Sequence, residues 1–182
     1  KYIINHQFFD TWSHDMAYIL GFIITDGYVS EDRKCVEFGI CTRDLEVLRY
    51  IKSFLCLSEN HPIVNECVYD ERFKRLIYRS RLTVYSKYII QILSEKFGIK
   101  QAKSGKENIN FDIPQEFLGD FIRGVFDGDG WVTEKSACPL STGICSASKA
   151  FILQIQKLLN NKGCICSDHG VWYIKMSTEQ SV

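Results

Sequence analysis

The chain has 182 residues, of which 46% are hydrophobic and 24% are charged. That is enough apolar material for one large domain, or for two small repeats that share a core, and it excludes a disordered chain. The 22 basic and 22 acidic residues cancel, so a nucleic-acid partner would require charge that is segregated onto one face.

The sequence lacks the features of membrane and secreted proteins. The apolar run 16–24 is too short to cross a bilayer and the first residues do not resemble a secretory signal, so we expect a soluble, intracellular protein. The chain begins with Lys rather than Met, which predicts a fragment of something longer. Its eight cysteines are scattered, which favours reduced thiols over disulfides. A zinc site is disfavoured because no CxxC pair exists, and it would have to use Cys138, Cys145, Cys164, Cys166 and His169.

The first half of the chain begins with an apolar helix that ends in an acidic residue and a glycine. This helix is predicted over 18–27, with the sequence Tyr-Ile-Leu-Gly-Phe-Ile-Ile-Thr-Asp-Gly. A second helix begins near Asp44, a capping residue, and a third covers 86–97 and ends at Gly98. Strands are predicted over 28–34, 36–42, 63–69 and 74–85.

The second half repeats this order. An apolar helix over 121–130, Phe-Ile-Arg-Gly-Val-Phe-Asp-Gly-Asp-Gly, precedes strands over 131–135 and 140–145, a helix over 148–161, and strands near 164–166 and 171–176. Gly-Ile-Cys-Thr at 39–42 returns as Gly-Ile-Cys-Ser at 143–146, and the spacing between these copies differs by one residue from the spacing between Asp26 and Asp129. The sequence is therefore an internal duplication. Aligning Val84 with Met176 leaves the closing helix of the first half without a counterpart.

The two acid-ended helices resemble the LAGLIDADG motif of homing endonucleases. In each copy a glycine lies within the apolar helix and an acid-glycine pair ends it. The resemblance extends over essentially the whole chain, because paired motifs, repeat length and strand order are all similar to the single-chain, two-motif form. It implies an α+β fold with two pseudo-symmetric αββαββ(α) repeats, at 1–103 and 104–182, and antiparallel sheets that form a DNA-binding saddle.

Elementary electrostatics supports a metal site at the two helix ends. A carboxylate at the C-terminal end of a helix faces the negative pole of its dipole, which costs up to about 1 kcal/mol. Two such ends side by side also repel each other, and a divalent cation would stabilise them. Asp26 and Asp129 are therefore predicted metal ligands, with backbone carbonyls of Thr25 and Gly128 beside them. We expect Mg²⁺, with Mn²⁺ as a substitute.

The glycines of the motifs predict how the helices pack. Gly21 and Gly124 lie inside helices, where glycine costs about 1 kcal/mol relative to alanine. Close contact between the two helices at the repeat interface would explain both. Gly27 and Gly130, which end the motifs, are predicted to adopt positive φ.

Asp127 has no acidic counterpart in the first motif, where Ile24 stands, so we interpret it as a capping or structural carboxylate. The segment 127–130 resembles the start of a calcium loop, but the later ligands and the terminal Glu of an EF-hand are absent. An aspartic protease would need Asp-Thr-Gly or Asp-Ser-Gly, which neither copy has.

The strand over 74–85 predicts a basic sheet face. Leu76, Tyr78, Leu82 and Val84 share the even positions and should face the helices. Arg75, Arg79, Arg81 and Thr83 share the odd positions, on the opposite face. An ordinary solvated strand face is the alternative. Counting outward from the acids with the same period adds residues from other strands. The residues predicted to face DNA are Tyr28, Ser30, Arg72, Lys74, Arg75, Arg79, Arg81, Thr83, Trp131, Thr133, Lys135, Tyr173 and Lys175.

The family resemblance implies further catalytic positions and an activity. Thr42 and Ser146 stand where the family places residues that order water, and Lys100, with Lys103 next, stands where it places a lysine. The implied protein is a monomeric, intron- or intein-encoded endonuclease that uses a divalent metal to hydrolyse both strands of double-stranded DNA, leaving a staggered break in a long asymmetric target. Two alternatives stay open, an RNA-binding intron maturase and a cleavage-inactive DNA-binding protein of the same fold.

Overall fold

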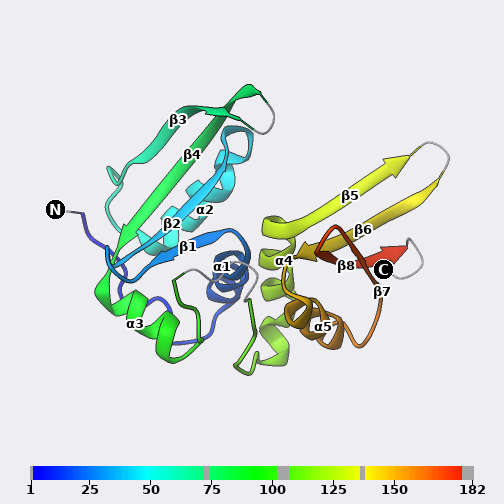
Figure 1. Cartoon of the computed structure of the whole chain (residues 1–182). Helices are drawn as coiled ribbons and strands as arrows, with labels where there is room; N and C mark the ends of the chain where they lie inside the picture. Colours follow the sequence, from blue (N-terminus) through cyan, green and yellow to red (C-terminus); the bar gives the residue numbers. More distant parts are fainter. Residues whose placement is uncertain (1, 72–73, 102–106, 136–137, 178–182) are drawn as a thin grey trace.

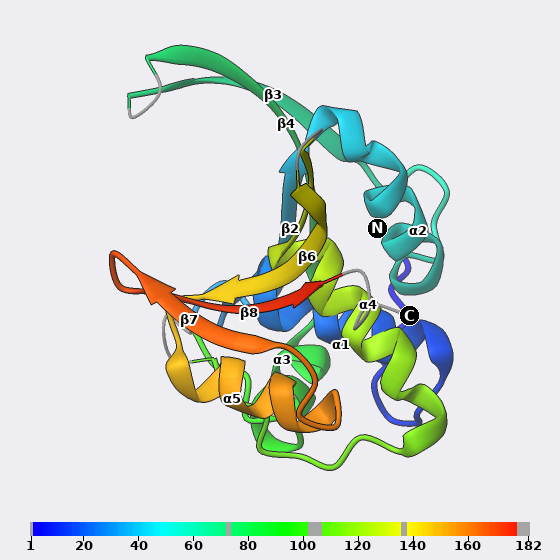
Figure 2. The ribbon, with the colours of Figure 1, turned by 90° about the vertical axis from the view of Figure 1, so that its right-hand side faces the viewer.

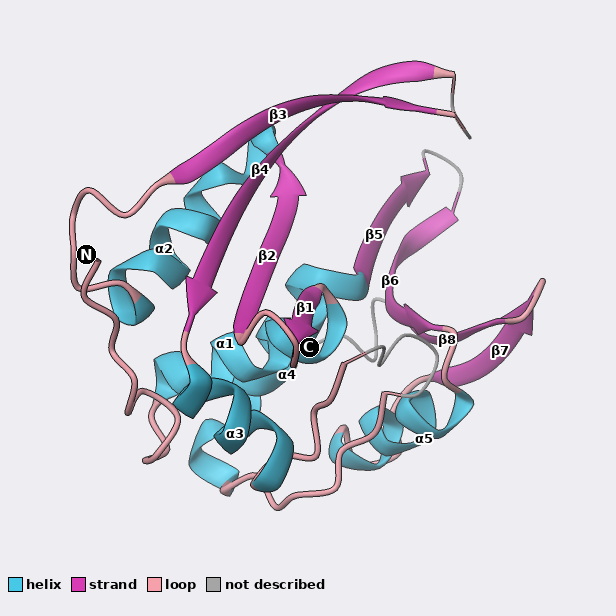
Figure 3. Cartoon of the chain, turned by 60° about the vertical axis from the view of Figure 1, so that its left-hand side comes forward, coloured by secondary structure: helices cyan, strands magenta, loops and turns pink. Residues whose placement is uncertain are grey.

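The computed structural model describes residues 2–71, 74–101, 107–135 and 138–177. Helices α1 (His14–Thr25) and α4 (Leu118–Asp129) lie side by side in the middle of the molecule, with one antiparallel sheet on each side of the pair (Figure 1). The two sheets rise on either side of the paired helices (Figure 3). Within the described residues, none of the helices is both long and apolar enough to span a membrane.

Each half of the chain has the predicted order of elements. The first contains β1 (Gly27–Ser30), β2 (Cys35–Cys41), the short η1 (Thr42–Asp44), α2 (Leu45–Leu55), β3 (Ile63–Asp70), β4 (Arg75–Tyr85) and α3 (Lys87–Glu95), with the sheet order β1-β2-β4-β3. The second contains η2 (Gln115–Phe117) before α4, then β5 (Gly130–Lys135), β6 (Cys138–Ser146), α5 (Lys149–Leu158), β7 (Cys164–Asp168) and β8 (Val171–Ser177), with the order β5-β6-β8-β7.

The helices beside the sheets are amphipathic, and their apolar faces complete the core. In α2 the buried residues are Leu48, Ile51 and Leu55, at the spacing of one helix face. In α5 they are Phe151, Ile152 and Ile155. The inner face of the first sheet contributes a row of buried side chains from three strands, Val29, Val36, Phe38, Leu82 and Val84.

The hairpin of β3 and β4 extends beyond α2 (Figure 2). Leu76 and Tyr78, which lie on the apolar side of β4, are therefore 57% and 63% exposed. The prediction that these two residues face the helices is wrong, because α2 covers only the part of the hairpin near Leu82 and Val84.

The two motif helices touch backbone to backbone. A Cβ atom added to Gly21 would lie 2.2 Å from the carbonyl oxygen of Phe121, and one added to Gly124 would lie 2.0 Å from that of Tyr18. This confirms the prediction that the two glycines allow close helix contact. A cluster of aromatic rings, Trp12, Phe97, Phe111, Phe117 and Phe121, joins the two repeats nearby.

The prediction of positive φ at Gly27 and Gly130 is wrong, since Gly130 has a φ of −86° and only Gly98, Gly163 and Gly170 are positive among the described glycines. Both motif glycines instead serve close approach. A Cβ on Gly27 would lie 2.7 Å from Cα of Ile23, and one on Gly130 would lie 2.3 Å from the carbonyl oxygen of Phe126. The chain can therefore turn against the last turn of each helix only without a side chain.

Candidate active site

The two predicted acids lie at adjoining helix ends. Asp26 caps α1, with its backbone N–H donating to the carbonyl of Phe22 at 2.9 Å, and Asp129 is the last residue of α4. The residue before Asp129 packs against the first helix end, because a Cβ on Gly128 would lie 2.0 Å from Oγ1 of Thr25 and 3.5 Å from the backbone N of Asp26. The fold therefore brings the two acids together from opposite halves of the chain.

A cavity of about 530 Å³ lies beside Asp26. The helix ends contribute Asp26, Asp127 and Gly128 to its lining, and β4 contributes Arg79 and Arg81. One wall is therefore acidic and another carries guanidinium groups. The remaining lining residues are Phe22, Glu37, Gly39, Ile40, Cys41, Asp44 and Val47.

The strand pairs give a common frame for the two repeats. Gly27 pairs with Phe38, which pairs with Leu82, while Gly130 pairs with Ile144, which pairs with Ile174. The correspondence of Val84 with Met176 is thereby confirmed. In this frame, however, the two Gly-Ile-Cys copies are displaced by two residues, so that Cys145 occupies the position of Gly39.

This displacement makes the surroundings of the two acids unequal. Gly39 leaves open space, since nothing described lies within 4 Å of a Cβ added to it. In the second repeat, the Cys145 thiol donates to the backbone carbonyl of Asp129 at 3.4 Å. Burial and the nearby Asp129 carboxylate raise the pKa of Cys145. The cavity therefore opens on the Asp26 side.

Cys41 lines the cavity and has a different environment from Cys145. The backbone N–H and the guanidinium of Arg43 donate to the thiol and lower its pKa. Cys41 is also exposed. Since the thiolate is the reactive form, the lowered pKa raises the reactive fraction of Cys41 near neutral pH.

We expect iodoacetamide at pH 7.5 to alkylate Cys41 several-fold faster than Cys67 or Cys164, as followed by peptide mass spectrometry. Arg43→Ala should slow the reaction at Cys41 and leave the other two unchanged. Equal rates at all three cysteines in the unaltered protein would contradict the assigned role of Arg43.

The structure places the three further catalytic candidates in different surroundings. Thr42 accepts a hydrogen bond from Ser80 at 3.2 Å. Ser146 is buried and donates to Glu107 at 3.3 Å, so the side chain directed at Asp129 is that of Cys145 instead. Lys100 is exposed, in a segment that Gln101 joins to Glu31 after β1, and Lys103 lies outside the described residues.

Asp127 connects the two motif helices. The phenol of Tyr18, on α1, donates to Oδ2 of Asp127 at 2.8 Å, and the guanidinium of Arg123 lies 4.6 Å from the centre of the Tyr18 ring. A structural role was predicted, but the partner comes from the other repeat rather than from a local cap. Burial, followed by the hydrogen bond to Asp127, raises the pKa of Tyr18 above its ordinary value of 10.

This shift predicts a loss of stability at alkaline pH. The folded state holds the Tyr18 proton more tightly than the unfolded state, so its contribution is fully present below pH 10 and is lost as pH rises above 10. In urea unfolding experiments, Tyr18→Phe should lower the free energy of unfolding by about 1 kcal/mol at pH 7. Between pH 10 and 11 the free energy of unfolding should fall less steeply for the variant than for the wild type. An equal fall in both proteins would rule out this coupling.

The structure places most residues of the predicted DNA face on the outer side of the two sheets. Ser30 is a correction, since it lies on that side but is buried and accepts a hydrogen bond from the backbone N–H of Arg33 at 3.2 Å. Arg72 and the side chain of Lys135 lie outside the described residues. Exposed or half-buried positions are found for Tyr28, Lys74, Arg75, Arg79, Arg81, Thr83, Trp131, Thr133, Tyr173 and Lys175.

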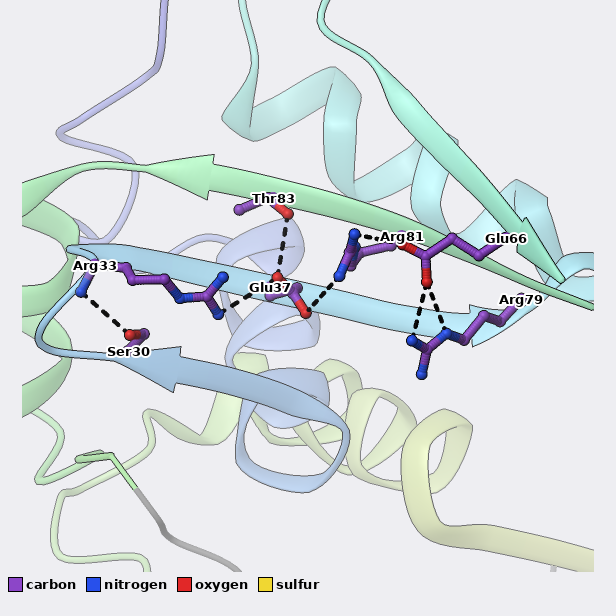
Figure 4. Close-up of polar contacts among 7 residues, drawn as sticks. All are labelled: Ser30, Arg33, Glu37, Glu66, Arg79, Arg81 and Thr83. Carbon is purple, nitrogen blue, oxygen red and sulfur yellow. Dashed lines mark hydrogen bonds and ion pairs between the residues drawn. The ribbon is translucent and has the colours of Figure 1, made fainter. Parts of the chain in front are cut away.

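Two residues of this face were missed from the sequence. Glu37 on β2 and Glu66 on β3 lie among the arginines of β4, and Figure 4 shows their ion pairs. The alternation of β2 could have identified Glu37, because it shares a face with Gly39 and Cys41. The position of Glu66 depends on the β3–β4 pairing, which sequence alone does not establish.

The donor set at the helix ends fits a hard divalent cation. Asp26 and Asp129 supply carboxylate oxygens, which Mg²⁺ and Ca²⁺ prefer, and the Gly128 backbone lies against Asp26. Among the described residues, no group of three or more His, Cys, Asp or Glu side chains could hold a metal ion. A metal here would therefore also need backbone carbonyls, water or a ligand oxygen.

Comparisons with known proteins agree with this arrangement. Residues 116–167 match the family model described as a LAGLIDADG-like domain. The homing endonuclease I-WcaI bound to its DNA recognition sequence is similar, with 13% identity and a TM-score of 0.63, over 95% of this chain and 81% of that chain. I-SmaMI bound to uncleaved DNA target in the presence of calcium ions has 12% identity and a TM-score of 0.56, over 92% and 80%.

A third similar structure is an I-DmoI variant in complex with its nicked target DNA in the presence of manganese, with 18% identity and a TM-score of 0.51, over 91% and 89%. No curated protein sequence matches the chain. At these identities the structural likeness establishes the fold. The chain therefore contains a LAGLIDADG-like domain and has the fold of the single-chain LAGLIDADG homing endonucleases.

Proposed function

We propose that the protein is a site-specific DNA endonuclease that acts as a monomer and makes a staggered double-strand break with the help of a divalent metal. The observation that carries the proposal is the contact between the two acid-ended helices, which brings the helix ends that bear Asp26 and Asp129 together beside a cavity lined by Asp26, Arg79 and Arg81. The similar structures bound to DNA support the choice of partner.

We assign a different role to each group of residues in the site. Asp26 and Asp129, with backbone carbonyls near Thr25 and Gly128, would hold the metal, for which we propose Mg²⁺. A bound divalent ion supplies an activated water and stabilises the leaving oxygen. The guanidinium groups of β4 face the duplex and orient it, and the open position at Gly39 leaves room beside Asp26.

A cleavage-selection assay tests this function directly. The protein is mixed with a randomised duplex library in Mg²⁺, Ca²⁺ or EDTA, and the cut ends are sequenced. Cutting at one long asymmetric site in Mg²⁺ and not in EDTA is the expected result. Specific binding without cutting would replace the nuclease with a binding protein, and preference for structured RNA over the duplex would indicate a maturase.

A further inference from the structure

A cluster of five charged residues lies on the outer face of the first sheet (Figure 4), and three of them, Glu37, Arg79 and Arg81, line the same cavity as Asp26. Glu66 accepts from Arg79 through Oε2, at 3.0 Å from Nε and 2.9 Å from Nη2, and its other oxygen, Oε1, binds Nη2 of Arg81. Glu37 binds Nη1 of Arg81 at 3.6 Å and Nη2 of Arg33 at 3.6 Å. Three guanidinium groups are thus linked through two carboxylates.

The side chains of the two glutamates are more buried than those of the arginines. The side chains of Glu37 and Glu66 are 18% and 22% exposed, while that of Arg79 is 47% exposed. Arg81 is held at both terminal nitrogens and is 34% exposed. Arg81 therefore cross-links the two carboxylates, and Arg79 presents more of its guanidinium to a ligand.

The bonds to Glu66 leave one edge of Arg79 directed away from the carboxylate. They use the edge formed by Nε and Nη2, and Nη1 has no recorded partner in the described part of the chain. The end of the guanidinium, with one N–H on Nη1 and the second N–H on Nη2, can still donate two parallel hydrogen bonds. That is the geometry with which arginine binds O6 and N7 of guanine.

The carboxylate also changes what Arg79 binds best. A phosphate would have to compete with Glu66 for the positive charge, whereas guanine offers neutral acceptors that can be bound while the ion pair remains. A guanidinium already fixed by its neighbour also loses less conformational entropy when it binds. Glu66 thus weakens non-specific attraction and favours a base contact.

We propose that Glu66 is a specificity-determining positioning residue, which holds Arg79 so that it reads a single guanine and keeps it from acting as a phosphate contact. The proposal rests on the DNA-binding function proposed above. It applies to the first repeat only, because the second repeat cannot form the same cluster. The positions corresponding to Glu37, Glu66, Arg79 and Arg81 are Gly143, Asp168, Val171 and Tyr173.

The test compares binding preferences at every position of the target. Duplexes that bind the wild type, Glu66→Gln or Arg79→Lys are selected from a randomised library in Ca²⁺. Thermal unfolding verifies that each variant is folded. The wild type should favour G·C at one position by about tenfold, the size expected for one bidentate contact. Both variants should lose the preference at that position and retain it elsewhere.

Salt dependence gives the second readout. With a non-specific duplex, Glu66→Gln should bind more tightly and the slope of log K against log salt should steepen by about one, because one more guanidinium reaches a phosphate. Glu95→Gln is the matched control, since it removes the same charge from an exposed position on α3. Within the described residues, the hydrogen bonds of the Glu95 side chain are those from Gln91. The Glu95→Gln variant should leave the base preferences and the slope as they are in the wild type.

A Glu66→Gln variant with an unchanged preference at every position would overturn the proposal while leaving DNA recognition intact. Loss of preference at all positions together would also overturn it, because the effect would then not be confined to Arg79. A wild-type protein that selects no sequence at all would refute the proposed function itself, and the inference with it.

Discussion

Asp26→Asn is expected to reduce the rate of DNA cleavage by about a thousandfold and to change DNA affinity by no more than a few-fold. The amide keeps the size of the side chain but loses the charge that would hold a divalent cation between the helix ends. Metal assistance contributes several kcal/mol of transition-state stabilisation, and each 1.36 kcal/mol corresponds to a factor of ten. Single-turnover cleavage of the selected target in Mg²⁺ measures the effect.

Asp129→Asn should behave in the same way, whereas Asp112→Asn, at an exposed position between α3 and α4, should cleave at the wild-type rate. The binding measurement distinguishes a catalytic defect from an unfolded protein. Full activity in either Asp26→Asn or Asp129→Asn would remove that carboxylate from the proposed site.

Gly124→Ala is expected to lower the free energy of unfolding by about 2 to 3 kcal/mol. The new Cβ would lie 2.0 Å from the carbonyl oxygen of Tyr18, a backbone atom, so the two motif helices would have to separate. Overpacking of this kind costs about 1–3 kcal/mol or more, and it outweighs the gain of up to about 1 kcal/mol in helix propensity. The melting temperature should fall by roughly 6–10 °C.

Gly119→Ala provides the matched control on the same helix. Nothing described lies within 4 Å of a Cβ at Gly119, so only the helix-propensity gain remains, and the melting temperature should rise by a few degrees. If Gly124→Ala were as stable as Gly119→Ala, the contact between α1 and α4 would be looser than the structure shows. Gly21→Ala should match Gly124→Ala, since its Cβ would lie 2.2 Å from Phe121.

The order of elements could be predicted from the sequence because each depends on local periodicity. The buried faces of α2 and α5 and the apolar motif helices follow from residues a few positions apart. The duplicated acid-glycine ends also predict that Asp26 and Asp129 lie at the ends of two neighbouring helices, as the structure shows. Close helix contact followed from the cost of Gly21 and Gly124 within helices.

The rest depends on which residues face each other across the sheets and helices. The ion pairs of Glu66 with Arg79 and Arg81 depend on the β3–β4 register. The contact of Cys145 with Asp129 depends on the position of β6 relative to α4. Leu76 and Tyr78 had the right alternation for a core, but their exposure is decided by the length of α2. Tyr18 and Asp127 meet only because the motif helices pack together.

The displaced Gly-Ile-Cys copies have a consequence for how such duplicated proteins diverge. In the common strand frame the second copy has moved by two residues, which is the smallest insertion or deletion that a strand accepts without exchanging its inner and outer faces. A one-residue change would have turned Ile144 outward. An engineered exchange of strands between the two halves therefore has to follow the strand pairing rather than the matching sequence.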